Sequence, residues 1–300
     1  MIQPEYLQKG DTVAIVSTAR KISSDKIIPA IKLLENWGLN VIIGETIGSE
    51  ENQFSGNDEA RMDDFQQMLD NPKVKAIWCA RGGYGTVRIV DKLDFSAFKK
   101  HPKWIIGYSD ITVLHSQFHN FGIETLHATM PINIENNSKQ ALATLKMSLF
   151  GKNLSYEFPS SEKNKSGDIS GEIVGGNLSV LYSLLGSNSS IKTNGKILFI
   201  EDLDEYLYHI DRMCMNLKRN GYFTHLKGLI VGGMSDMRDN EIPFGKTAEE
   251  IISDYVSEYN FPVVFNFPAG HLDDNHALIL GRKVNLNVNV GEIKSKISFL

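Results

Sequence analysis

Residues 104–115 are Trp104-Ile-Ile-Gly-Tyr-Ser-Asp-Ile-Thr-Val-Leu-His115. The first three residues form a short apolar run, which predicts a buried strand, and the next four predict a tight turn. From Ile111 onward, apolar residues recur at helical spacing. Ser109 is therefore expected at the point where a strand of a sheet passes into a helix.

A serine at such a point has two interpretations. Its hydroxyl can project from the carboxyl end of the strand beside the backbone N–H of Asp110, as a serine nucleophile and its oxyanion donors require. Alternatively, Ser109 and Asp110 only cap the helix, because both residue types are favoured at helix N-termini. Residues 104–115 alone leave both interpretations open.

Strands and helices alternate on both sides of this stretch. Apolar runs predict strands at residues 12–16, 41–43, 74–79 and 123–126, and helical periodicity predicts helices at residues 24–37, 57–70 and 138–150, the second capped by Asn57. Strand–helix units of about 30 residues are typical of a parallel sheet with helices on both faces. In such sheets, ligands bind beyond the carboxyl ends of the strands.

A glycine-rich loop, Arg81-Gly-Gly-Tyr-Gly85, follows the strand predicted at residues 74–79. Glycines let the backbone approach a ligand closely and present its N–H groups. A dinucleotide phosphate loop is the first alternative, but the G-x-G-x-x-G pattern is not satisfied. The second alternative, a plain glycine turn, stays open on this motif alone.

The second half of the chain has a different pattern. Residues 155–167 are poor in apolar side chains and predict a linker between domains. Beyond it, strands are predicted at residues 196–200, 229–231, 262–267, 284–290 and 293–299, and helices at residues 208–219 and 247–259. We therefore expect an α/β domain at 1–154 and a smaller, β-rich mixed α/β domain at 168–300.

Composition excludes several classes of protein. The net charge of −5 and the pI of about 5.9 argue against a nucleic-acid-binding surface. No apolar run reaches the roughly 20 residues that a membrane span needs, and the N-terminus does not resemble a signal peptide. Cys79 and Cys214 are expected to be core thiols. The expected location is the cytoplasm.

Three residues share a position at or just past the end of a predicted strand: Ser109, Glu201 and His271. A serine hydroxyl needs an adjacent base, histidine is the usual base at neutral pH, and a carboxylate can orient its ring. Each residue also has an ordinary interpretation. Glu201 could be one solvated acid of an acidic run, and the ring of His271 could bond only to backbone.

Four motifs in order resemble the LD-carboxypeptidases, which are serine peptidases that include muramoyltetrapeptide carboxypeptidase and the microcin C self-immunity hydrolases. They are Ala80-Arg-Gly-Gly-Tyr-Gly85, Gly107-Tyr-Ser-Asp-Ile-Thr112, Ile200-Glu-Asp202 with Ile210-Asp-Arg-Met213, and Pro268-Ala-Gly-His271. Four motifs in order are far more specific than any one of them, and together they span nearly the whole chain.

The resemblance implies a catalytic triad carried by Ser109, Glu201 and His271, with an oxyanion hole from the backbone N–H groups of Gly83 and Asp110. It implies a flavodoxin-like N-terminal domain, with the site between the two domains. It also implies no metal and no cofactor, and a homodimer.

The activity implied is removal of the terminal D-alanine from a murein tetrapeptide during cell-wall recycling. The partner is then a small peptide, not a nucleic acid or a membrane. A carboxypeptidase must bind a free carboxylate, and Arg81, with Tyr84 in the same loop, is the expected substrate contact. The alternative is that Arg81 pairs with a structural acid.

Other functions stay open at this point. One is hydrolysis of a peptidyl-nucleotide antibiotic, as in the microcin relatives, although no insertion for a nucleobase platform is visible. Another is a non-enzymatic cleft-binding protein, which would have no need for all three triad residues. An ordinary α/β-hydrolase shares the order Ser, acid, His, but its turn is G-x-S-x-G and position 111 is Ile.

Overall fold

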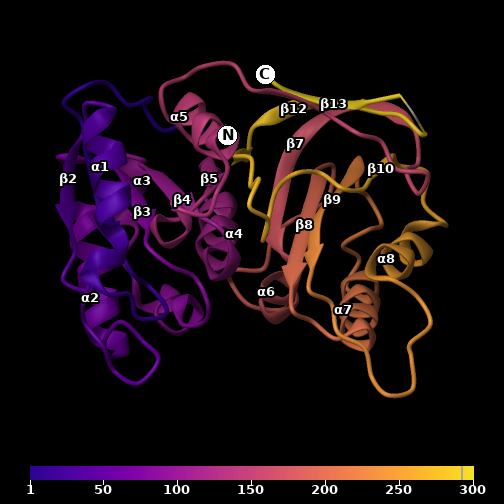
Figure 1. Ribbon diagram of the computed structural model, residues 1–300, viewed down its shortest axis with the longest axis horizontal. Helices are drawn as coiled ribbons and strands as arrows, with labels where there is room; N and C mark the ends of the chain where they lie inside the picture. The colour runs from indigo at the N-terminus through magenta and orange to yellow at the C-terminus, as the bar shows by residue number, and fades with distance from the viewer. Residues whose placement is uncertain (292) are drawn as a thin grey trace.

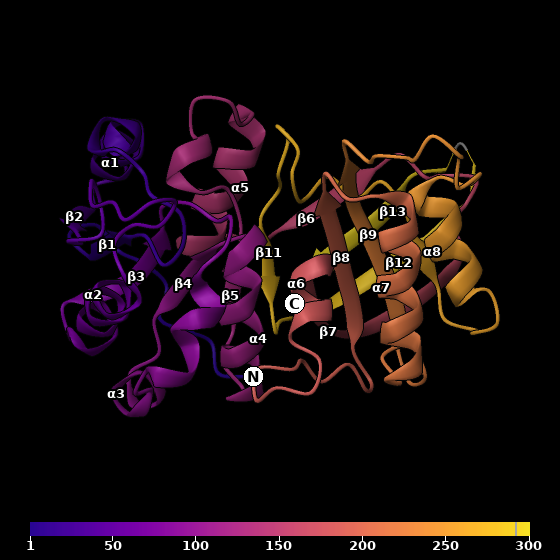
Figure 2. The ribbon, with the colours of Figure 1, turned by 90° about the horizontal axis from the view of Figure 1, so that it is seen from below.

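The computed structural model describes residues 1–291 and 293–300. It contains two sheets that lie side by side, one built mainly from the indigo-to-magenta half of the chain and one from the orange-to-yellow half (Figures 1 and 2). None of the helices in this described part is long and apolar enough to cross a membrane.

The first sheet has the strand order β11-β5-β4-β3-β1-β2. Its strands are β1 (Thr12–Val16), β2 (Asn40–Ile43), β3 (Val74–Cys79), β4 (Trp104–Gly107), β5 (Thr125–His127) and β11 (Leu278–Leu280). All pairs are parallel except β11 with β5. The order 2-1-3-4-5 of its parallel strands is that of flavodoxin-like folds, as the resemblance implied.

Helices cover both faces of the first sheet, because its strands are apolar on both sides. They are α1 (Ile28–Asn36), α2 (Asp58–Asp70), α3 (Ser96–Lys100), α4 (Thr112–Asn120) and α5 (Lys139–Leu149). Along β1, Val13 and Ile15 pack in the core with α1 and α5, whereas Ala14 and Val16 pack with α2, α3 and α4. Asn57 caps α2 as predicted, accepting a hydrogen bond from the Ala60 N–H at 2.8 Å.

The second sheet has the order β10-β9-β8-β7-β12-β13-β6. Its strands are β6 (Ser155–Phe158), β7 (Gly167–Asn177), β8 (Ile197–Leu203), β9 (Gly228–Ser235), β10 (Val263–Val264), β12 (Lys283–Val288) and β13 (Ser295–Phe299). The half from β7 to β10 is parallel, and the half from β7 to β6 is antiparallel. Helices α6 (Leu178–Ser183), α7 (Leu207–Arg219) and α8 (Ala248–Val256) share one core with the parallel half. The mixed, strand-rich second half is therefore confirmed.

The two halves are more interwoven than expected. The predicted linker, residues 155–167, begins with β6, which is the edge strand of the second sheet. The linker prediction is therefore wrong for Ser155–Phe158. Strand β11 returns from the second half and pairs with β5 of the first sheet (Figure 2). One hydrophobic core joins both parts, because Leu126 and Leu278 pack in the same cluster as Phe199 and Phe267.

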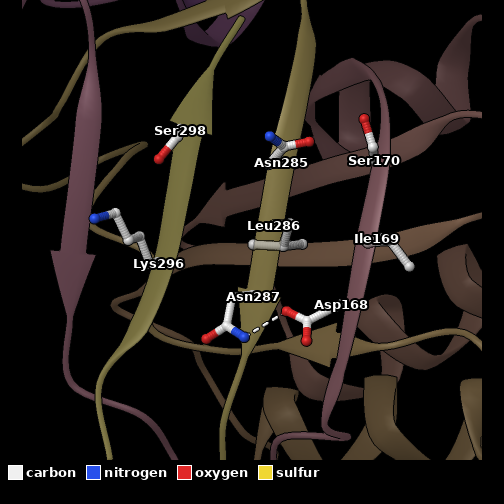
Figure 3. A pocket seen from close by; sticks show the side chains of 8 residues that line it. All are labelled: Asp168, Ile169, Ser170, Asn285, Leu286, Asn287, Lys296 and Ser298. Atoms are coloured by element: carbon white, nitrogen blue, oxygen red, sulfur yellow. Dashed lines mark hydrogen bonds between the residues drawn. The ribbon is translucent and has the colours of Figure 1, made fainter.

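The antiparallel half of the second sheet carries a shallow polar hollow on β7, β12 and β13 (Figure 3). Its lining includes Asn285, Lys296 and Ser298, and Asp168 accepts a hydrogen bond from Asn287. None of the residues predicted for the site lines this hollow. Cys79 and Cys214 are free and buried, as predicted.

Candidate active site

Ser109 lies at a strained turn between β4 and α4. It begins a short 3-10 helix, η4 (Ser109–Ile111), that continues directly into α4. The φ angle of Ser109 is 63°, in the left-handed region that costs a non-glycine residue roughly 1–2 kcal/mol. The N-cap residues of η4 and α4 are Tyr108 and Ile111, so the interpretation of Ser109 as a helix cap is wrong.

The strain at Ser109 gives a prediction for stability. Ser109→Gly and Ser109→Ala both remove the hydroxyl, but only glycine adopts a positive φ without steric cost. The free energy of unfolding of the glycine variant should exceed that of the alanine variant by about 1 kcal/mol, net of the greater freedom of glycine in the unfolded chain. Urea titration of the two variants measures the difference. A less stable glycine variant would contradict a strained turn.

The glycine loop packs directly against this turn. An added Cβ at Gly82 would lie 2.9 Å from the Cβ of Ser109, 3.1 Å from its Oγ and 3.4 Å from the backbone nitrogen of Asp110. Only glycine permits this approach, so the loop backbone lies beside both the hydroxyl and the nitrogen. Gly83 follows with a φ of 106°, and its Cα faces the side chain of Arg20.

The side chain of Asp110 fixes the turn to the glycine loop. Its Oδ2 accepts a hydrogen bond of 2.9 Å from the Thr86 N–H, and the Thr86 hydroxyl is 2.7 Å from that of Thr18. The buried Arg61 donates to the carbonyl oxygens of Thr18 and Gly85. Burial raises the pKa of Asp110, although the hydrogen bonds from Thr86 and the charge of Arg61 oppose the shift.

Glu201 and His271 form a hydrogen-bonded pair. Glu201 is fully buried near the end of β8, and its Oε2 accepts from Nδ1 of His271 at 2.7 Å and from the His271 backbone N–H at 3.2 Å. Gly270 allows this contact, because an added Cβ there would lie 2.6 Å from Oε2. Glu201 is therefore not a solvated acid, and the His271 ring is not held by backbone alone.

The charge of Glu201 controls the protonation of His271. Burial lowers the pKa of His271, but the negative charge and the hydrogen bond of Glu201 outweigh burial and raise the pKa above its ordinary value. Because Nδ1 faces the carboxylate, it carries the proton in the neutral ring, and Nε2 is left to accept another. This is the tautomer that a general base requires.

Ser109 and His271 come together through Tyr108. The ring of Tyr108, the residue before Ser109, packs edge-on against the His271 ring with 4.9 Å between centroids. The Tyr108 hydroxyl donates to Oδ1 of Asn133 at 3.1 Å, which fixes the ring. No hydrogen bond joins the Ser109 hydroxyl to His271 within the described residues, and such contacts often tighten only with substrate bound.

A second contact between the two halves involves Asn177, to which no sequence motif pointed, together with two residues of the quoted motifs, Thr112 and Asp202. Thr112 of α4 accepts a hydrogen bond of 2.9 Å from the Asn177 N–H, and Nδ2 of Asn177 donates to Asp202 at 2.9 Å. Asp202 directly follows Glu201, and burial together with the charge of Glu201 raises its pKa to about 7. The helix after the serine is thus tied to the strand that carries the acid.

The loop after His271 is held by the first half of the chain. The Ser138 N–H and Nδ2 of Asn137 both donate to the carbonyl oxygen of Asp273, at 2.8 and 2.7 Å. Ala277 donates its N–H to the hydroxyl of Thr144 on α5 at 3.0 Å. His271 is therefore fixed from both halves of the molecule.

The predicted substrate contacts lie around the glycine loop. Arg81 donates from Nη1 to the carbonyl oxygen of Lys21 at 3.0 Å, and it forms no ion pair with an acid of the described residues. The ring of Tyr84 is 48% exposed and lies 6.1 Å from that of Phe54, centroid to centroid. Among the described residues, nothing supports the alternative of Arg81 as the partner of a structural acid. In the part of the chain that the structure describes, no cluster of three or more His, Cys, Asp or Glu residues is placed to hold a metal.

Two family models match the chain. The model of the LD-carboxypeptidase N-terminal domain matches residues 13–128, and that of the LD-carboxypeptidase C-terminal domain matches residues 170–286. The chain belongs to the LD-carboxypeptidase family.

Individual members of the LD-carboxypeptidase family are similar over nearly the full length. A probable murein peptide carboxypeptidase of Bacillus subtilis is 36% identical, over 95% of this chain and 91% of that protein. The Microcin C7 self-immunity protein MccF of Escherichia coli is 26% identical, over 95% of this chain and 94% of that protein. The crystal structure of muramoyltetrapeptide carboxypeptidase from Oxalobacter formigenes has a TM-score of 0.86 at 27% identity and covers 96% of this chain and 98% of its own. The two relatives named as carboxypeptidases support a hydrolase with carboxypeptidase activity.

Proposed function

We propose that this chain is a serine-type L,D-carboxypeptidase that removes the terminal D-alanine from murein tetrapeptide. The observation that carries the proposal is the 2.7 Å hydrogen bond from His271 to the buried Glu201, beside the strained turn of Ser109. A buried carboxylate, an imidazole with Nε2 free and a serine at a strand–helix turn are the parts of a nucleophile-and-base mechanism.

In the first half-reaction, Nε2 of His271 takes the proton of the Ser109 hydroxyl as Oγ bonds to the scissile carbonyl carbon. The carbonyl oxygen becomes an oxyanion, which the N–H groups of Gly83 and Asp110 stabilise. His271 then gives its proton to the nitrogen of D-alanine, and the C–N bond breaks. Glu201 stabilises the imidazolium throughout.

The first half-reaction leaves the acyl group bound as an ester to Oγ of Ser109. In the second half-reaction, a water molecule takes the place of the released D-alanine. His271 takes a proton from the water as its oxygen bonds to the acyl carbon, and the proton returns to Oγ of Ser109 as the ester bond breaks. The products are free D-alanine and a murein tripeptide. The cell-wall recycling role and the homodimer remain predictions from the family resemblance, and the cytoplasmic location remains a prediction from the composition of the sequence.

The proposed substrate is supported by relatives named as murein peptide and muramoyltetrapeptide carboxypeptidases. Similarity to MccF over 95% of the chain favours a second candidate, hydrolysis of an amide in a peptidyl-nucleotide antibiotic. Both candidates use the same nucleophile and base, so they differ only in the substrate that is bound.

Incubation with a mixture of murein tripeptide, tetrapeptide and pentapeptide tests the substrate. We expect mass spectrometry to show conversion of the tetrapeptide to the tripeptide with release of D-alanine, while the pentapeptide persists. An aminoacyl sulfamoyl adenosine, incubated separately, should be cleaved far more slowly. An unchanged tetrapeptide with rapid cleavage of the nucleotide conjugate would instead select the second candidate.

A further inference from the structure

Two arginines beside the glycine loop form no ion pair with an acid in the described part of the chain. The arginines of residues 1–154 are Arg20, Arg61, Arg81 and Arg88. Arg61 and Arg88 both pair with Asp58 on α2. Within the described residues, neither Arg20 nor Arg81 forms an ion pair. The two arginines that remain available to an anion are thus the two that touch the loop beside Ser109.

Arg81 is already engaged in contacts that do not involve the triad residues. Besides bonding the Lys21 carbonyl, it lines a hollow of about 330 Å³ together with Lys26, Ser49 and Ile132. None of Ser109, Glu201 and His271 lines this hollow. Burial, and then the like charge of Arg20, lower the pKa of Arg81.

Arg20 lies across the loop itself. An added Cβ at Gly83 would fall 2.1 Å from Cδ of Arg20 and 2.5 Å from its Cγ, so the arginine stem covers the face of Gly83. The residue before Gly83 is Gly82, where an added Cβ would lie 3.1 Å from Oγ of Ser109. The exposed side chain of Arg20 therefore crosses the loop that carries the expected oxyanion donor.

The backbone of Arg20 is fixed independently of its side chain. Its carbonyl oxygen accepts hydrogen bonds from the hydroxyls of Ser17 at 2.8 Å and Ser55 at 3.1 Å. Its N–H donates to the Gly82 carbonyl at 3.4 Å, and Arg81 holds the carbonyl of the next residue, Lys21. A guanidinium on a fixed backbone that pairs with none of the acids the structure describes is preorganised for an anionic ligand.

We propose that Arg20, rather than Arg81, binds the terminal carboxylate of the substrate, and that Arg81 positions Arg20 through the Lys21 carbonyl. This inference rests on the proposed function. In a carboxypeptidase substrate, the carboxylate lies one residue beyond the scissile carbonyl, and the guanidinium presents two parallel N–H donors to it. The substrate class is then peptides that end in a single residue with a free carboxylate.

The test compares Arg20→Gln with Arg81→Gln and with Lys26→Gln, a control that removes one positive charge from the same edge of the molecule. The substrates are a murein tetrapeptide and the same peptide with its D-alanine amidated. The wild type should prefer the free acid. Arg20→Gln should lower kcat/KM for the free acid by roughly ten- to a hundred-fold and leave the amide unchanged, because only the charge-assisted contact is lost.

Arg81→Gln should keep the preference for the free acid, with a smaller fall in kcat/KM, and Lys26→Gln should behave as the wild type. A preference for the free acid that survives in Arg20→Gln but vanishes in Arg81→Gln would overturn the assignment and return the carboxylate to Arg81. Unchanged melting temperatures check that each variant is folded.

Measurements of binding without turnover test the carboxylate site at Arg20 separately from the proposed activity. Calorimetry on the Ser109→Ala variant measures the affinity for both peptides without turnover, with Arg20 present or replaced by Gln. Tighter binding of the free acid that depends on Arg20 supports the carboxylate site even if the wild type cleaves neither peptide. Equal affinity for the acid and the amide overturns the site whatever the activity is.

Discussion

Replacing Ser109 with alanine is expected to lower kcat for D-alanine release by at least about a thousand-fold, because the variant has no nucleophile. The oxyanion donors and the binding contacts remain, so a small residual rate over the uncatalysed reaction should persist. KM should change little. Steady-state kinetics on the tetrapeptide, with released D-alanine as the readout, measure both constants.

The loss must come from chemistry and not from unfolding. The Ser109 hydroxyl caps no helix, and its removal leaves the strained backbone of the turn in place. The alanine variant should therefore melt within a few degrees of the wild type. Ser96→Ala, at an exposed serine on α3, is the matched control and should keep full activity. Near-normal turnover in Ser109→Ala would reject the serine mechanism.

The parts of the fold that could be predicted from the sequence are those with a strong local signal. The strands of the first sheet are continuous apolar runs, and Asn57 and Ser138 each accept the capping hydrogen bond at the start of a predicted helix. Ser109, Glu201 and His271 could be placed near strand ends for the same reason. Their meeting could not be predicted in this way, because Ser109 follows β4 of the first sheet and Glu201 lies on β8 of the second sheet.

The parts that could not be predicted depend on partners far away in the sequence. Strand β6 has an alternating, half-polar pattern that looks like a loop until β13 pairs with it. Strand β11 has only three residues, and its partner β5 lies in the other half of the chain. The side chain of Arg20 meets Gly83 in space and not in sequence, so no spacing rule connects them.

Glu201→Gln tests whether the carboxylate of Glu201 supports His271 as the base. Glutamine keeps the shape of the side chain but removes the charge that opposes the effect of burial on the pKa of His271. The imidazolium formed in the transition state then has no carboxylate to stabilise it, so kcat should fall by roughly a hundred- to ten-thousand-fold while KM changes little. A variant with normal kcat and a raised KM would make Glu201 a substrate contact instead.

Stability is the control for this variant. Oε1 of Glu201 is buried without a hydrogen-bond partner within the described residues, so an amide nitrogen in its place would be unpartnered and would cost about 1–3 kcal/mol. Thermal melting should show that the variant is still folded at the assay temperature. Glu157→Gln, at an exposed acid that pairs with Lys296, should change neither kcat nor stability appreciably.

The pH profile distinguishes a Glu201 that raises the pKa of the base, His271, from a Glu201 with a merely structural role. His271 must be neutral to accept the Ser109 proton, so kcat/KM of the wild type should rise with pH through a pKa above the ordinary histidine value of about 6.5. In Glu201→Gln, burial still lowers the pKa of His271 and the opposing charge is gone, so the acidic limb should move to lower pH. Measurements between about pH 5 and 9 follow the acidic limb in the wild type and in the variant. An acidic limb that stays in place while kcat falls would mean that Glu201 acts on another group than His271.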